Sequence, residues 1–111
     1  MPETESEEGM TDNETMKRVT ELAVNHYGNG HQITKCIEEV GEFLQALGRY
    51  NIAEEGEPAL LAKGNLQEEI ADAIIMLQQM RLIYGQEEID WWINFKLERL
   101  EDRIEKEKKS V

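Results

Sequence analysis

The chain has 111 residues, of which 40% are hydrophobic and 32% charged, and its formal net charge is −12. This length predicts one domain. So acidic a surface repels phosphate backbones and anionic membranes, so we expect neither a nucleic acid duplex nor a membrane as partner. No stretch approaches the roughly 18 apolar residues of a membrane span. Because the one cysteine, Cys36, cannot form an internal disulfide, we expect a cytoplasmic protein. Cys36 lies among apolar positions, so we expect its thiol to be buried.

The N-terminal region divides into a tail and a first helix. Residues 1–10 are acidic and predict a disordered leader, followed by a single helical domain over 11–111. Thr11 and Glu14 have the spacing of a capping box, which predicts a helix over about 12–27. Gly28 is expected to end that helix, since glycine accepts a left-handed cap cheaply.

A second helix is predicted over about 31–50. Its apolar residues step by four and three, which is typical of a packing seam. A loop at 51–57 and a short turn at 59–62 are expected to follow. The seam consists of Ile33, Ile37, Val40, Leu44 and Leu47.

Two further helices are predicted over about 65–84 and 86–108, separated by Gly85. The first of these is apolar nearly all round, so we expect burial on more than one side and an oligomer. The architecture is therefore expected to be all-α and four-helix bundle-like, completed by oligomerisation. The predicted seam of the third helix comprises Leu66, Ile70, Ala73, Leu77, Met80 and Tyr84.

Two acidic pairs border these seams. Glu39 and Glu42 lie on the second helix, and Glu69 and Asp72 on the third. A carboxylate at the edge of an apolar core is costly unless it is paired or metal-bound. We therefore expect the pairs to face each other and to hold a hard divalent cation such as Mg²⁺. The alternative is that they are ordinary surface acids paired with lysine and arginine.

The fourth helix carries a basic stripe. Trp92, Lys96, Arg99 and Arg103 fall within about 60° of one another on a helical wheel. Lys96 is either a phosphate clamp or a snorkelling lysine that pairs with a nearby acid. Trp91 and Trp92 could stack on a base, although packing in a core or an interface is the commoner use of such residues.

The acidic motifs resemble those of a known family. Lys35 precedes Glu38-Glu39-Val40-Gly41-Glu42, and Glu69-Ile70-Ala71-Asp72 follows later. This pattern resembles the MazG-like group of the all-α NTP pyrophosphatase superfamily, over roughly residues 15–104. The resemblance implies hydrolysis of nucleoside triphosphates to a monophosphate and pyrophosphate, by a homodimer or homotetramer. It also implies Mg²⁺, with Mn²⁺ as a possible substitute, held by Glu39, Glu42, Glu69 and Asp72.

Other roles follow from the same resemblance. Glu38 is expected to be catalytic, either orienting the attacking water as base or binding a second metal. Lys35, ahead of the first motif, is expected to bind substrate. From the basic stripe rather than from the resemblance, Lys96, Arg99 and Trp92 are expected to do so as well. The long loop between the motifs and the sequence of the fourth helix depart from the family pattern. Two alternatives stay open: a narrow-specificity dCTP- or dUTP-type hydrolase, and a non-catalytic acidic helical module that binds a protein.

Overall fold

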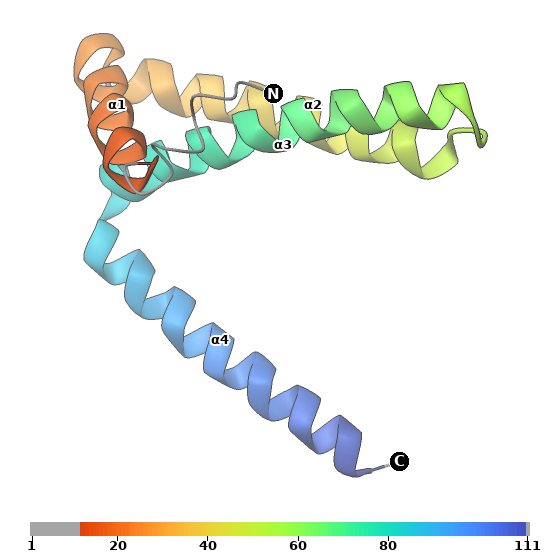
Figure 1. The fold of residues 1–111 in the computed structure, drawn as a ribbon. Helices are drawn as coiled ribbons and strands as arrows, with labels where there is room; N and C mark the ends of the chain where they lie inside the picture. The colour runs from red at the N-terminus through yellow and green to blue at the C-terminus, as the bar shows by residue number, and fades with distance from the viewer. Residues whose placement is uncertain (1–11, 111) are drawn as a thin grey trace. The chain divides into compact units, whose positions relative to one another are not determined.

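The computed structural model describes residues 12–110, which fold into four helices and contain no strand (Figure 1). The helices are α1 (Asp12–Tyr27), α2 (Asn29–Ile52), α3 (Glu57–Tyr84) and α4 (Gln86–Lys109). The prediction of an all-α chain with four main helices is confirmed. The predicted acidic leader and Thr11 of the predicted capping box lie outside the described residues.

Glycines separate the helices where the backbone adopts a positive φ. The φ angles are 90° at Gly28, 96° at Gly56 and 115° at Gly85. A side chain is strained in this region, whereas glycine enters it freely. The helix ends predicted at Gly28 and Gly85 are confirmed.

The predicted start of the third helix is wrong. Instead of beginning near residue 65, α3 begins at Glu57 and continues through Pro58 and Gly64. Proline is compatible with the first turn of a helix, where its missing N–H is not needed. Glycine inside a helix costs only about 1 kcal/mol, which packing can offset. The connection between α2 and α3 is therefore the short segment 53–56, not a long loop.

The described chain forms two compact units, of which the first comprises residues 12–80. In this unit α2 and most of α3 run antiparallel as a helical hairpin, and α1 contacts α2 (Figure 1). The Gln32 amide donates to the Gln79 side chain at 2.7 Å, and seven residues further along α2 Glu39 lies near Asp72. Because Asp72 lies seven residues before Gln79 on α3, the two contacts belong to one antiparallel register.

The second unit comprises residues 81–110, which include the end of α3 and the whole of α4. The Arg81 guanidinium forms an ion pair with the Asp90 carboxylate across the turn at Gly85. Within residues 12–110, no helix combines the length and the hydropathy that a membrane crossing requires.

The packed face of α2 lies one residue away from the predicted seam. Gln32, Cys36 and Ala46 are buried, whereas Ile37 is 70% exposed and Leu44 58% exposed. One residue turns a helix by about 100°, so the larger apolar side chains point away from α3. The burial of the Cys36 thiol, which raises its pKa, confirms one prediction for this helix.

The packed face of α3 agrees with the prediction only in part. Leu66 and Ala73 are buried as expected, but Ile70 and Leu77 are exposed. Small side chains at Ala46 and Ala73 leave room for close helix approach, and the paired glutamine amides occupy positions where apolar residues are usual. The apolar core of the described residues is consequently thin. It consists of Cys36, Ala46, Leu66, Ala73 and Met76.

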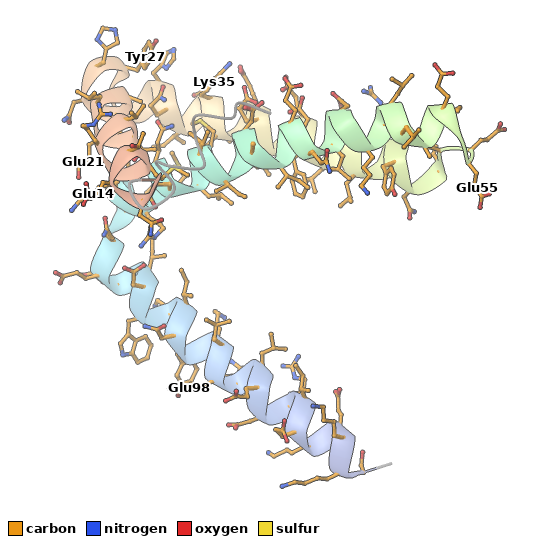
Figure 2. The ribbon with its side chains drawn as sticks, viewed as in Figure 1. Glu14, Glu21, Tyr27, Lys35, Glu55 and Glu98 are labelled. Carbon is orange, nitrogen blue, oxygen red and sulfur yellow. The ribbon has the colours of Figure 1, made fainter. Side chains whose placement is uncertain are left out.

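Acidic side chains away from the hairpin interface extend into solvent. Glu14 and Glu21 lie on α1, and Glu55 lies at the turn between α2 and α3 (Figure 2). All three are exposed. They contrast with the acids between α2 and α3.

Candidate metal centre

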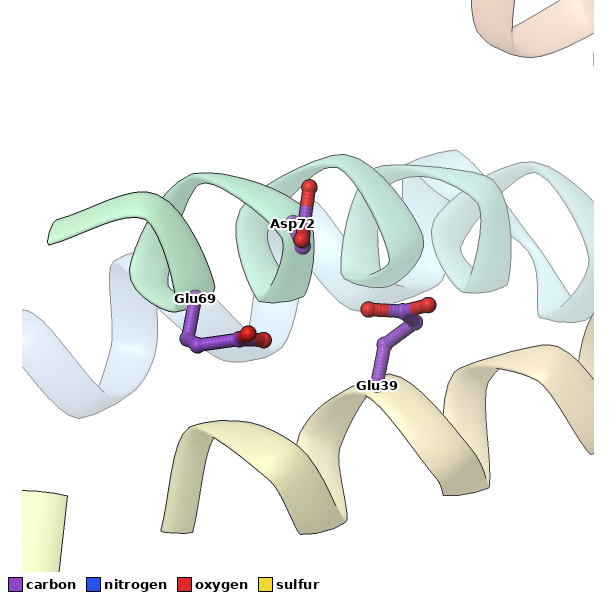
Figure 3. Close-up of side chains that lie close together, drawn as sticks. All are labelled: Glu39, Glu69 and Asp72. Atoms are coloured by element: carbon purple, nitrogen blue, oxygen red, sulfur yellow. The ribbon is translucent and has the colours of Figure 1, made fainter. Parts of the chain in front are cut away.

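Three carboxylates converge between α2 and α3. Glu39 on α2 and Glu69 and Asp72 on α3 each offer an oxygen, and these oxygens lie within 4.8 Å of one another (Figure 3). Each of the three residues is half-buried. Glu39 occupies the packed face of α2, three residues after Cys36 and seven before Ala46, so the hairpin itself directs it towards α3.

Glu69 carries the electrostatic cost of this arrangement. Its Oε2 atom is buried and has no hydrogen-bond partner among the described residues. Its pKa is raised above the ordinary carboxyl value, first because the carboxylate is desolvated and then because Glu42, Asp72 and Glu39 repel its charge. The cluster therefore favours either a bound proton or a bound cation.

The fourth predicted ligand, Glu42, lies at the edge of the cluster. Its side chain is exposed, and it does not join the three converging oxygens. It is nevertheless close enough for its charge to raise the pKa of Glu69 more than either Asp72 or Glu39 does. The structure thus brings together three predicted ligands directly and keeps the fourth within electrostatic reach.

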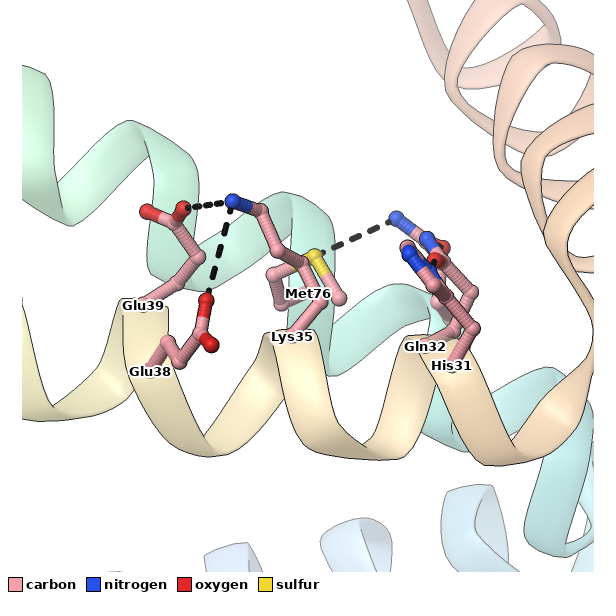
Figure 4. Close-up of polar contacts among 7 residues, drawn as sticks. His31, Gln32, Lys35, Glu38, Glu39 and Met76 are labelled. Atoms are coloured by element: carbon pink, nitrogen blue, oxygen red, sulfur yellow. Dashed lines mark hydrogen bonds and ion pairs between the residues drawn. The ribbon is translucent and has the colours of Figure 1, made fainter.

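Lys35 links the cluster to Glu38. Its ammonium lies 3.3 Å from the Glu39 carboxylate and 3.8 Å from that of Glu38 (Figure 4). The hydrogen bond and charge of Glu39 are the main causes of a raised lysine pKa. Lys35 therefore compensates the charge of Glu39, as the surface-acid alternative expects. Its ion pairs leave the buried oxygen of Glu69 without a cation.

The predicted catalytic residue, Glu38, is separate from the three converging acids. Its side chain is 59% exposed and shares the Lys35 ammonium with Glu39, but it is not one of the three converging acids (Figure 4). It is accessible to a water molecule or a substrate, but it does not add a ligand to the converging oxygens.

The predicted basic stripe lies on α4 in the second unit. The Lys96 ammonium lies 5.8 Å from the centre of the Trp92 ring, and the Arg99 guanidinium lies 5.9 Å from that of Phe95. Phe95 also stacks on Trp91 at 5.4 Å. These cation–π contacts order the stripe within its own helix. The sequence analysis assigned no role to Phe95. The signal was its helical spacing, three residues after Trp92 and four before Arg99.

A pocket near the acidic cluster was also missed. It has a volume of about 590 Å³ and is lined by Tyr27, His31, Gln32, Thr34, Lys35, Glu38 and Met76. The sequence signal for this pocket was Gln32, a polar residue one helical turn before Cys36 on the packed face of α2.

No protein-family model, curated protein or solved structure matches this chain. The acidic motifs and the geometry around them are therefore the features from which a function can be inferred.

The raised pKa of Glu69 predicts how stability changes with pH. In the folded chain the Glu69 carboxyl keeps its proton to a higher pH than in the unfolded chain. In the unfolded chain this carboxyl titrates at about pH 4.3. The metal-free protein therefore loses stability as the pH rises from that value through the raised pKa. Mg²⁺ or Mn²⁺ compensates the carboxylates, so the gain in Tm on adding metal is larger at about pH 7.5 than at about pH 5.

Glu69→Gln provides the matched variant. It should raise the Tm of the metal-free protein at neutral pH and remove the gain on adding metal. Glu68→Gln removes the same charge from the preceding, exposed position and should retain that gain. A Glu69→Gln protein that still gains Tm with metal would contradict the assignment. Differential scanning calorimetry with and without metal measures both effects.

Proposed function

We propose that the chain hydrolyses nucleoside triphosphates to a nucleoside monophosphate and pyrophosphate. Mg²⁺, or Mn²⁺ in its place, would be held by Glu39, Glu69 and Asp72, with Glu42 completing the site. The observation that carries the proposal is the buried, unpartnered Oε2 of Glu69 among converging acids. The order of the two acidic motifs, which resembles that of the MazG-like group, supports hydrolysis of a nucleoside triphosphate as the reaction.

The donor set suits this metal. Carboxylate oxygens are hard ligands, which Mg²⁺ prefers over the nitrogen and sulfur donors that zinc favours. When bound, Mg²⁺ supplies positive charge that balances the phosphate oxygens and the departing pyrophosphate.

The side chains around the cluster would bind the substrate and activate the attacking water. Lys35 exchanges its ion pair with Glu39 for a phosphate oxygen and holds the triphosphate. Glu38 orients a water molecule and accepts its proton as that water attacks the α-phosphorus. The bond from this phosphorus to the bridging oxygen breaks, and pyrophosphate leaves in line. Substrate binding by Lys96, Arg99 and Trp92, which lie in the second unit, stays a prediction from the sequence.

The protein would act as a homodimer or homotetramer. The thin core and the exposed apolar residues of α2 support this proposal, because monomeric proteins rarely expose large contiguous apolar surface. A second copy that covered Ile37 and Leu44 would complete the bundle. The buried Cys36 thiol suits the expected cytoplasmic location.

Two alternatives differ from this proposal in what they would do with the same residues. A narrow-specificity dCTP- or dUTP-type hydrolase would use the same acids and differ in how it selects the base. A non-catalytic acidic module that binds a protein would use the exposed apolar face of α2 and leave the carboxylates without chemistry.

Pyrophosphate release from a panel of nucleoside triphosphates with Mg²⁺ tests the proposal. Asp72→Asn and Glu42→Gln should each lower kcat/KM by at least about a hundredfold, the scale on which loss of one charge-stabilising group acts. Glu68→Gln should leave it unchanged. Turnover of one base alone would favour the narrow hydrolase. Absence of turnover with every triphosphate would contradict both enzymatic functions.

The oligomer is tested separately by sedimentation velocity. Ile37→Glu places a charge on the exposed apolar face of α2 and should convert the assembly to a monomer. Ile52→Glu changes a residue that is 81% exposed at the end of α2, and it should leave the mass unchanged. A wild-type protein that sediments as a monomer would contradict this part of the proposal.

A further inference from the structure

The pocket beside the metal centre has one aromatic wall. The rings of Tyr27 and His31 stack with their centres 5.0 Å apart and their planes 17° from parallel. Tyr27 ends α1, and only Gly28 separates it from α2. The positive φ of Gly28 reverses the chain within one residue and brings the two rings together. Both residues are exposed, so the wall is open to a ligand.

The inner side of the pocket is polar. Gln32 is only 4% exposed, and its side-chain oxygen accepts a hydrogen bond from His31 Nδ1 at 2.7 Å. Its amide donates to Gln79 across the hairpin, also at 2.7 Å. These two contacts fix the amide in place and use one of its two N–H groups and one of its two lone pairs. The amide can therefore form further hydrogen bonds to a ligand. Met76, buried on α3, adds an apolar surface beside it.

The rim of the pocket joins it to the metal centre. Lys35 and Glu38 line the pocket, and the Lys35 ammonium also contacts Glu39 of the acidic cluster (Figure 4). Glu39 lies eight positions after His31 on α2, a distance of roughly 12 Å along the helix axis. One extended molecule can therefore reach from the aromatic wall to the carboxylates.

The charge distribution gives this molecule a direction. Lys35 at the rim and the metal would attract the phosphates towards the carboxylates. The lining away from this rim holds no lysine, arginine or carboxylate. An uncharged planar group with hydrogen-bonding edges suits the pocket itself. It would stack on the outer face of the Tyr27–His31 ring pair and bond to the Gln32 amide.

We propose that this pocket binds the nucleobase of the triphosphate, with its face on the Tyr27–His31 wall and its edge at Gln32. The inference rests on the proposed function, because it assigns the other end of the same substrate. It makes Tyr27, His31 and Gln32 the residues that bind and select the base.

A kinetic comparison tests the aromatic wall. Tyr27→Ala and His31→Ala should each raise KM for a nucleoside triphosphate by about tenfold, the scale of losing one stacked base, with kcat unchanged. Inhibition by inorganic tripolyphosphate, which has no base, should be unaffected. His26→Ala is the matched control, because His26 also contacts the Tyr27 ring, at 4.7 Å, but does not line the pocket.

Several kinetic results would overturn the proposal. These are an unchanged KM in Tyr27→Ala and His31→Ala, an equal rise in His26→Ala, and an equal loss of tripolyphosphate inhibition. Each would show that the wall does not recognise the base.

A binding measurement separates this inference from the proposed function. Uridine, cytidine, adenosine and guanosine are titrated into the metal-free protein while the side-chain amide resonances of Gln32 are followed by NMR. At least one nucleoside should shift these resonances, and Tyr27→Ala should abolish the shift. If the wild type lacks turnover yet shows the shift, the catalytic proposal fails and the base pocket stands. If no nucleoside produces a shift, the pocket assignment fails even in an active enzyme.

Discussion

The register of the α2–α3 hairpin determines the chemistry of the first unit, because it places a carboxylate where water cannot fully solvate it. The hydrogen bond from Gln32 to Gln79 sets this register, and the same register brings Glu39 opposite Glu69 and Asp72. Glu69 then has a buried oxygen without a hydrogen-bond partner among the described residues. A helix pair chosen only for stability would place an apolar residue there. The buried acid therefore supports the proposed cation site.

The two halves of the proposed site follow from one helix. On α2, Glu39 meets the acids of α3, and Gln32 lines the pocket. Lys35 belongs to both, since its ammonium contacts Glu39 and its side chain lines the pocket. The connection through Gly28 adds Tyr27 from α1 at the far end. A substrate with a charged end and an uncharged planar end would match this arrangement along α2.

Much of the helical framework could be predicted from sequence, because glycines and apolar spacing act locally. The breaks at Gly28 and Gly85 illustrate this. The start of α3 at Glu57 was missed because Pro58 and Gly64 resemble breaks, although proline fits the first turn of a helix and one interior glycine costs only about 1 kcal/mol. The packed face of α2 was predicted one residue out of phase. Size and hydropathy favoured Ile37 and Leu44, whereas the hairpin packs Gln32, Cys36 and Ala46. The acidic pairs were recognised by their spacing, but the buried oxygen of Glu69 and the pocket depend on tertiary contacts.

The proposed metal centre requires the carboxylates of α2 and α3 to hold one divalent cation together. Anomalous diffraction from a crystal soaked in Mn²⁺ tests this most directly. We expect a single anomalous peak between α2 and α3, within coordination distance of Glu39, Glu69 and Asp72. Anomalous peaks at other positions on the protein, with no peak between α2 and α3, would contradict the proposed metal centre.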